Sequence, residues 1–169
     1  MKIILGSGPT RYEGWQDTDL QEHWSPNKLD VRMASDFEKW PNIEMALAEH
    51  IWEHLTQMEG IIAAQNCYRF IPRIRVATPD GLFPDDDYVA KAILGECPGD
   101  HKLLYNWMML SALFTSVGYK VTLLEWWDNG IFQYRPWDTE YGMIFRSVRY
   151  NSRHFGLIGY TSIILDAIR

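Results

Sequence analysis

The first residues suited to chemistry form a short turn, Gly6-Ser7-Gly8-Pro9, directly after the apolar run at residues 2–5. Glycine has no Cβ, so the backbone of this turn can pass close to a ligand. Asp19 closes the next short run, where α/β nucleotide-binding folds place an acid against ribose hydroxyls. A third glycine is missing and the spacing is too short for the dinucleotide fingerprint, so the pattern does not predict NAD binding.

The second group is the pentapeptide His-Ile-Trp-Glu-His at residues 50–54, which matches the H-x-x-E-H pattern of one class of zinc peptidases. On a helix, His50 and His54 would lie one turn apart and share a zinc ion, with Glu53 as the base. The sequence marks no third ligand. A zinc metallopeptidase therefore stays an alternative, beside helix-surface histidines without chemistry and a place in a cofactor pocket. We predict no metal site.

Two more residues are candidate general bases. Asp80 lies in Thr-Pro-Asp-Gly after the alternating run at 73–78, either as a turn residue or facing a pocket. His101 precedes an apolar helical run, either at a pocket rim or in a structural role. The arginine-rich stretch 146–153, with Arg149 near its centre, could bind a phosphate or carboxylate.

These residues need a sheet that brings them together, and the apolar pattern predicts one. The predicted strands are 2–5, 15–20, 29–32, 43–48, 73–78, 121–126 and 160–168, and the predicted helices are 49–58, 59–70, 85–94 and 102–117. Residues 128–156 are predicted to be irregular. Strands that alternate with helices and are apolar throughout are typical of a mostly parallel sheet with helices on both faces. Ligands bind at the carboxyl ends of such strands.

Length and composition narrow the function classes. The 169 residues predict a single domain spanning 1–169. A net charge of −6 disfavours nonspecific nucleic-acid binding. No apolar stretch is long enough to span a membrane, and the first run is too short for a signal peptide. Cys67 and Cys97 have no CxxC partner, so we expect reduced thiols and a cytoplasmic location.

Eight tryptophans are unusual in so short a chain. Most aromatic side chains serve a core, but some can line a pocket that holds flat or apolar groups. Four tryptophans fall near predicted strand ends or in the irregular segment, and we expect these to line a pocket: Trp15, Trp126, Trp127 and Trp137.

Taken in order, the segments resemble class I S-adenosylmethionine-dependent methyltransferases. The similarity is greatest to a compact group of predicted methyltransferases, similar to methyltransferase type 11, that is often linked to sugar and polysaccharide biosynthesis. It rests on the ordered set LGSGPTRYEGWQDTDL (5–20), AEHIWEHL (48–55), RIRVATPDG (73–81), HKLLYNWMMLSALFTSVGYKVTLLEW (101–126) and YTSIILDA (160–167).

The resemblance implies a Rossmann-like α/β sheet of seven strands, one of them antiparallel, with the first helix reduced or absent. It implies S-adenosylmethionine as the cofactor. By position, the turn residues Gly6, Ser7, Gly8 and Pro9 would approach the methionine part. Asp19 would bind the ribose, and Leu20 would flank the adenine. Asp30 and Val31 would lie at the adenine edge, with Glu49 and His50 near the sulfonium.

We therefore expect transfer of a methyl group to a small-molecule or sugar-like acceptor, with His50, Asp80 and His101 as candidate bases. Glu49 replaces the small polar residue usual in the group. Together with the missing helix, this makes a non-catalytic binding protein with the same fold a second alternative. No nucleic-acid or membrane partner is expected, and the oligomeric state is left open.

Overall fold

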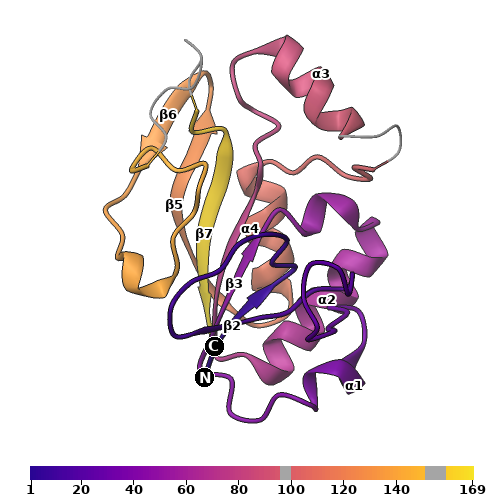
Figure 1. Cartoon of the computed structure of the whole chain (residues 1–169). Coiled ribbons are helices and arrows are strands. Elements are labelled where there is room, and N and C mark those ends of the chain that lie inside the picture. The colour runs from indigo at the N-terminus through magenta and orange to yellow at the C-terminus, as the bar shows by residue number, and fades with distance from the viewer. Residues whose placement is uncertain (96–99, 151–158) are drawn as a thin grey trace.

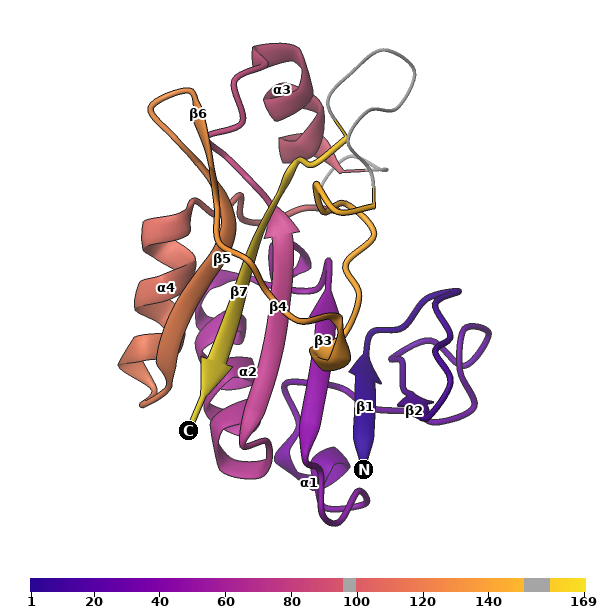
Figure 2. The ribbon, with the colours of Figure 1, turned by 90° about the vertical axis from the view of Figure 1, so that its left-hand side faces the viewer.

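The computed structural model describes residues 1–95, 100–150 and 159–169. Seven strands form one sheet (Figure 1), and their order is β2-β1-β3-β4-β7-β5-β6 (Figure 2). The sheet therefore draws on both ends of the chain. The strands are β1 (Lys2–Leu5), β2 (Trp15–Asp17), β3 (Met45–Glu49), β4 (Arg73–Pro79), β5 (Lys120–Asp128), β6 (Ile131–Tyr134) and β7 (Ser162–Ile168).

The sheet is parallel across β2, β1, β3 and β4, and β7 runs antiparallel to both of its neighbours. This confirms a mostly parallel sheet of seven strands, but the prediction of one antiparallel strand misses β6. Strand β6 pairs antiparallel with β5 through a tight hairpin at Asn129-Gly130. Both residues have positive φ, 49° and 74°, as a type I′ turn requires. This hairpin lies in the segment predicted to be irregular.

Two longer helices lie on one face of the sheet: α2 (Gln57–Phe70) and α4 (Trp107–Ser116). Thr56 and Glu59 form a capping box at the start of α2, each side chain bonding the other's backbone N–H. Asn106 caps α4 by accepting the Met109 N–H, so this helix begins five residues later than predicted. The remaining helices are α1 (Ala34–Phe37), α3 (Asp86–Leu94) and the 3-10 turns η1 (Trp52–His54) and η2 (Thr139–Tyr141).

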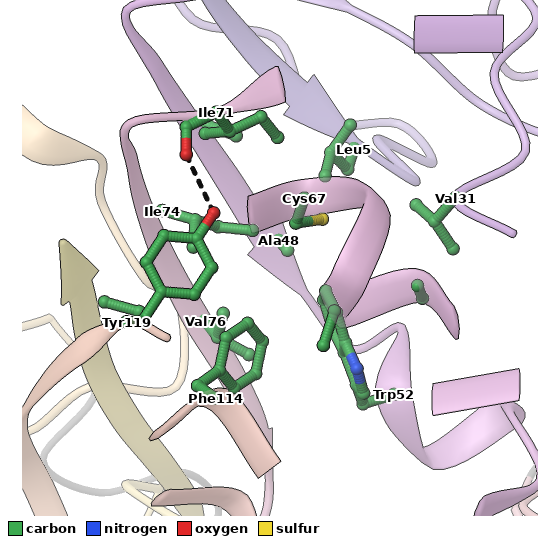
Figure 3. Close-up of a cluster of buried hydrophobic side chains, with 14 of the residues drawn as sticks. Leu5, Val31, Ala48, Trp52, Cys67, Ile71, Ile74, Val76, Phe114 and Tyr119 are labelled. Atoms are coloured by element: carbon green, nitrogen blue, oxygen red, sulfur yellow. Dashed lines mark hydrogen bonds between the residues drawn. The ribbon is translucent and has the colours of Figure 1, made fainter. Parts of the chain in front are cut away.

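The main core fills the space between the sheet and these two helices (Figure 3). Alternate strand residues such as Ala48, Ile74 and Val76 point into it and meet Trp52 and Phe114. The opposite face holds a smaller apolar cluster, formed by Leu47, Ala77, Leu124, Trp137, Ile144 and Ile164. The period of two along each strand thus explains why both faces of the sheet are covered.

Among the described residues, the α-helices that pack on the sheet, α2 and α4, cover one face, which corrects the prediction of helices on both. The turns at residues 6–14 contain no helix between β1 and β2, as expected. The face left open is covered instead by residues 135–148, which include η2 and cross in front of the sheet in Figure 2.

Two other predicted elements are wrong. Residues 29–32 form a turn, joined to the chain after β2 by an isolated bridge between Asp19 and Lys28. Residues 49–56 contain the end of β3, a bend and η1 in place of an α-helix, and α2 begins at Gln57. Cys67 is a buried free thiol, whereas Cys97 lies outside the described residues. In the described ranges, no helix is both long and apolar enough to cross a bilayer.

Candidate functional site

Two clefts open where β1 and β3 end, on either side of the glycine turn. The first measures about 810 Å³ and the second about 510 Å³. The first is lined by Asp19, Leu20, Asp30, Val31, Glu53, His54 and His101 among others, and the second by Ser7, Pro9, Tyr12, Glu49 and Phe145 among others. Four residues line both: Gly6, Gly8, His50 and Arg146. The two clefts therefore meet at these residues.

The glycine turn is built from backbone that other residues would adopt only with strain. Gly6 and Gly8 have φ of 55° and 49°. A Cβ on Gly6 would lie 2.9 Å from Ile51 Cγ1, whereas a Cβ on Gly8 would meet no described residue within 4 Å apart from its chain neighbours. The turn is tied to the residue that follows β2, because the Ser7 N–H donates to the carbonyl of Thr18 at 2.9 Å. The open side of Gly8 therefore leaves room for a bound group.

Asp19 is buried beside this turn. Its Oδ2 accepts the Gly8 N–H at 2.9 Å, and its Oδ1 accepts the Gln21 N–H at 2.9 Å. The carboxylate thus fixes the turn and contributes negative charge to the wall of the first cleft. Leu20, the next residue, is exposed and offers an apolar surface there.

The far wall of the first cleft carries Asp30 and Val31. Arg32 holds the Asp30 carboxylate with two side-chain hydrogen bonds, Nε to Oδ1 at 2.9 Å and Nη2 to Oδ2 at 2.8 Å. These bonds keep the pKa of Asp30 below its ordinary value. Arg32 also donates to Glu59 at 2.7 Å, which links this wall to α2.

Opposite charges line the second cleft. The Glu49 carboxylate accepts the Phe145 N–H at 3.0 Å, and burial raises the pKa of Glu49 while His50 and Arg146 oppose that shift. Arg146 lines both clefts. Tyr12 also lines the second cleft, and its hydroxyl donates to the Met143 carbonyl at 3.1 Å.

His50 lies at the junction of the clefts. Its φ of 58° turns the chain sharply after β3, and its N–H donates to the Ala77 carbonyl at 2.9 Å. Nδ1 lies 2.7 Å from Glu53 Oε1, and Nε2 lies 3.5 Å from Ser162 Oγ. Because residues 50–54 do not form an α-helix, His50 and His54 do not share the helical face that the zinc-peptidase pattern requires.

His101 is brought into the first cleft from a distant part of the chain. The N–H groups of Lys102 and Leu103 donate to the Glu53 carbonyl at 2.7 and 3.3 Å. The His101 ring then meets the His54 ring edge-on, with centroids 4.8 Å apart. The prediction of a cleft-rim position for His101 is therefore consistent with the structure, although α4 begins later.

Asp80 does not face either of these clefts. It is fully buried, its Oδ1 accepts the Leu82 N–H at 2.9 Å, and its Oδ2 accepts the Trp127 N–H at 2.8 Å. Burial raises the pKa of Asp80 to about 6. Of the two roles considered for Asp80, the turn residue is the one observed, which corrects its assignment as a candidate base.

The tryptophans chosen from the sequence line neither cleft: Trp15, Trp126, Trp127 and Trp137. Trp127 packs in an aromatic group with Phe83 and Phe132, and Trp137 lies under the Arg75 guanidinium. Trp24 lines the first cleft instead. Arg149 also stacks on Trp137 and donates to its carbonyl, so among the described arginines of this stretch Arg146 is the one that lines the clefts. Arg153 lies outside the described residues.

Solved structures match this arrangement over 99% of the chain. A SAM-dependent methyltransferase from Archaeoglobus fulgidus is 16% identical, with a TM-score of 0.63 over 85% of its length. Magnesium protoporphyrin IX methyltransferase from Synechocystis PCC 6803, with bound SAH, is 11% identical, with a TM-score of 0.57 over 73%. The small RNA methyltransferase HEN1 is 12% identical, with a TM-score of 0.60 over 23%.

The chain has the fold of a class I SAM-dependent methyltransferase. No protein-family model matches the chain, and no curated protein matches it by sequence. The type 11 subgroup therefore stays a prediction. In this methyltransferase fold, the glycine turn after β1 and the acid after β2 occupy the strand ends where α/β proteins bind nucleotides.

Proposed function

We propose that the protein transfers a methyl group from S-adenosylmethionine to a small-molecule acceptor. The observation that carries the proposal is the junction of the two clefts at Gly6, Gly8 and His50, where β1 and β3 end. A ligand with two unlike ends can occupy both clefts if its middle crosses this turn.

The nucleoside of the cofactor fits the first cleft. The Asp19 carboxylate offers an acceptor for ribose hydroxyls, and the apolar side chains of Leu20 and Val31 offer surfaces for a flat ring. The backbone at Gly8 leaves space for the cofactor to pass, because, apart from the adjacent residues, no atom of the described residues lies within 4 Å of the place where its Cβ would stand.

The amino-acid end of the cofactor fits the second cleft. This end carries an ammonium and a carboxylate, and the cleft presents Glu49 and Arg146 as partners of opposite charge. Glu49 is therefore a ligand for the ammonium in this proposal, which gives a reason for an acid at this position.

When bound, S-adenosylmethionine supplies a methyl group already activated by its sulfonium, so the protein needs chiefly to align the acceptor. His50 lies at the junction and can take a proton from a hydroxyl or amine acceptor. His101 and His54 line the part of the first cleft that is left for the acceptor. The net charge of −6 supports a small or sugar-like acceptor rather than a nucleic acid. The free thiol of Cys67 supports a cytoplasmic location.

Calorimetric titration with S-adenosylhomocysteine tests the cofactor assignment. We expect one site per chain in the wild type and at least tenfold weaker binding in Asp19→Asn, because a charge facing the ribose is removed. Asp87→Asn is the matched control, since Asp87 is exposed on α3 and lines neither cleft. No binding by the wild type, or equal binding by Asp19→Asn, would overturn the assignment.

Turnover separates an enzyme from a binding protein of the same fold. Incubation with S-adenosylmethionine and a panel of hydroxyl and amine acceptors should yield S-adenosylhomocysteine that depends on both protein and acceptor. Tight cofactor binding with no such product across the panel would favour the non-catalytic alternative.

A further inference from the structure

Three side chains in the first cleft form a cluster to which the transfer of the methyl group itself assigns no chemical step. The ligand atoms of Glu53, His54 and His101 all lie within 4.8 Å of one another. All three residues line the cleft. Two imidazoles and a carboxylate are a common ligand set for divalent transition metals.

The Glu53 carboxylate is buried with only one of its two oxygens hydrogen-bonded to a described residue. Its side chain is fully buried, and although Oε1 pairs with His50 Nδ1 at 2.7 Å, Oε2 has no hydrogen-bond partner among the described residues. A buried carboxylate oxygen left without a partner costs several times the free energy of an ordinary hydrogen bond. A bound cation would satisfy this oxygen.

The two histidines are held in the orientation of metal ligands. Nδ1 of His54 lies 3.0 Å from Asp100 Oδ1, and Nδ1 of His101 bonds the Ala92 carbonyl. A partner at Nδ1 keeps the proton there and leaves the Nε2 lone pair available to a metal. The backbone bonds from Lys102 and Leu103 to the Glu53 carbonyl fix the three residues relative to one another.

We propose that Glu53, His54 and His101 bind a divalent transition metal ion. Three protein ligands leave coordination positions open to the cleft. The role of this metal rests on the proposed function: the ion would bind an oxygen of the acceptor and hold it for methyl transfer. The metal site itself does not depend on that reaction.

Metal binding by the whole chain tests the site. Protein stripped with EDTA and dialysed is mixed with excess Zn²⁺ or Co²⁺, desalted and analysed for bound metal. We expect one ion per chain in the wild type and in His23→Ala, whose exposed histidine lines neither cleft. Glu53→Gln and His101→Ala should lose stoichiometric metal. The bound Co²⁺ should show the visible absorption of a low-symmetry site, which those two variants should lack.

Two further variants sharpen the outcome. Asp100→Asn, which weakens the support of His54 Nδ1, should reduce Zn²⁺ affinity about tenfold. His50→Ala should retain one zinc, whereas a site of the zinc-peptidase pattern, which uses His50 and His54, should lose it. Circular dichroism in EDTA shows that each variant is folded.

The proposal is overturned if the wild type retains neither ion, or if folded Glu53→Gln and His101→Ala retain it fully. Titration with S-adenosylhomocysteine in EDTA reports on the cofactor site alone. A failure of the metal site is therefore distinguishable from a failure of the proposed function.

Discussion

Replacing Arg75 with methionine should destabilise the protein strongly and loosen the second cleft. Arg75 is fully buried on β4. Its guanidinium donates to both oxygens of Asp166 on β7, at 2.7 and 2.9 Å, and to the carbonyls of Asp138 and Gly142, each at 2.7 Å. One side chain thus joins two central strands to the segment that carries Arg146.

The expected loss follows from what the substitution leaves behind. Methionine fills most of the volume but leaves the Asp166 carboxylate buried without its cation, and two carbonyls without a donor. Breaking a buried ion pair by removing one partner costs about 3–5 kcal/mol, and each abandoned carbonyl adds about 1 kcal/mol or more unless water reaches it. We expect Arg75→Met to lower the free energy of unfolding by at least about 4 kcal/mol, a large share of a typical total of about 5–15 kcal/mol.

Urea denaturation followed by circular dichroism measures this loss. Arg69→Met is the matched control, because its pair with Glu38 is exposed and 3.8 Å long and should contribute less than about 1 kcal/mol. The double variant Arg75→Met/Asp166→Leu should recover part of the stability, since no unpaired charge remains. A loss below about 1 kcal/mol in Arg75→Met would refute the reasoning.

Three further predictions concern the clefts and the strand ends. Affinity for S-adenosylhomocysteine should fall as pH drops through the raised pKa of Glu49, because protonation removes the charge that faces the ammonium. Calorimetric titrations between pH 8 and 5 measure this affinity, and the Glu49→Gln variant should show no such change with pH. Arg146→Gln should weaken that binding at least fivefold, whereas Arg149→Gln, which removes a stack on Trp137, should chiefly lower the melting temperature. The Asp80 carboxyl should titrate near pH 6 by ¹³C NMR; since burial raises its folded-state pKa, its contribution to stability should decline as pH rises through that value.

The sequence predicts those parts of the site whose conformation is set by residues close to them in the chain. The glycine turn and Asp19 lie within a few residues of short strands, and positive φ at Gly6 and Gly8 is what glycine permits. The hairpin at Asn129-Gly130 was missed although its signal is present, since Asn-Gly between apolar runs is a strong mark of a two-residue turn.

The parts that could not be predicted depend on contacts between distant segments. The Glu53–His101 approach rests on backbone bonds from residues 102 and 103 to the Glu53 carbonyl, for which no local pattern exists. The prediction that four tryptophans line a pocket was wrong for a similar reason. Trp137 is buried because its Nε1 donates to Glu125 at 2.9 Å and because Arg75 lies over its ring, and neither partner is near it in sequence.

Two charged residues at buried strand positions explain how an irregular segment can cover the sheet face opposite α2 and α4. Arg75 and Glu125 are both fully buried, at places where a sheet covered by helices would need apolar side chains. A helix satisfies its own backbone groups, but the segment 135–148 is largely irregular and cannot. Arg75 supplies its carbonyls with donors, and Glu125 accepts the Ser147 hydroxyl at 2.6 Å and the Val148 N–H at 3.0 Å. These two charges therefore hold in one place a segment that lines the second cleft and covers a sheet face on which no α-helix of the described residues packs.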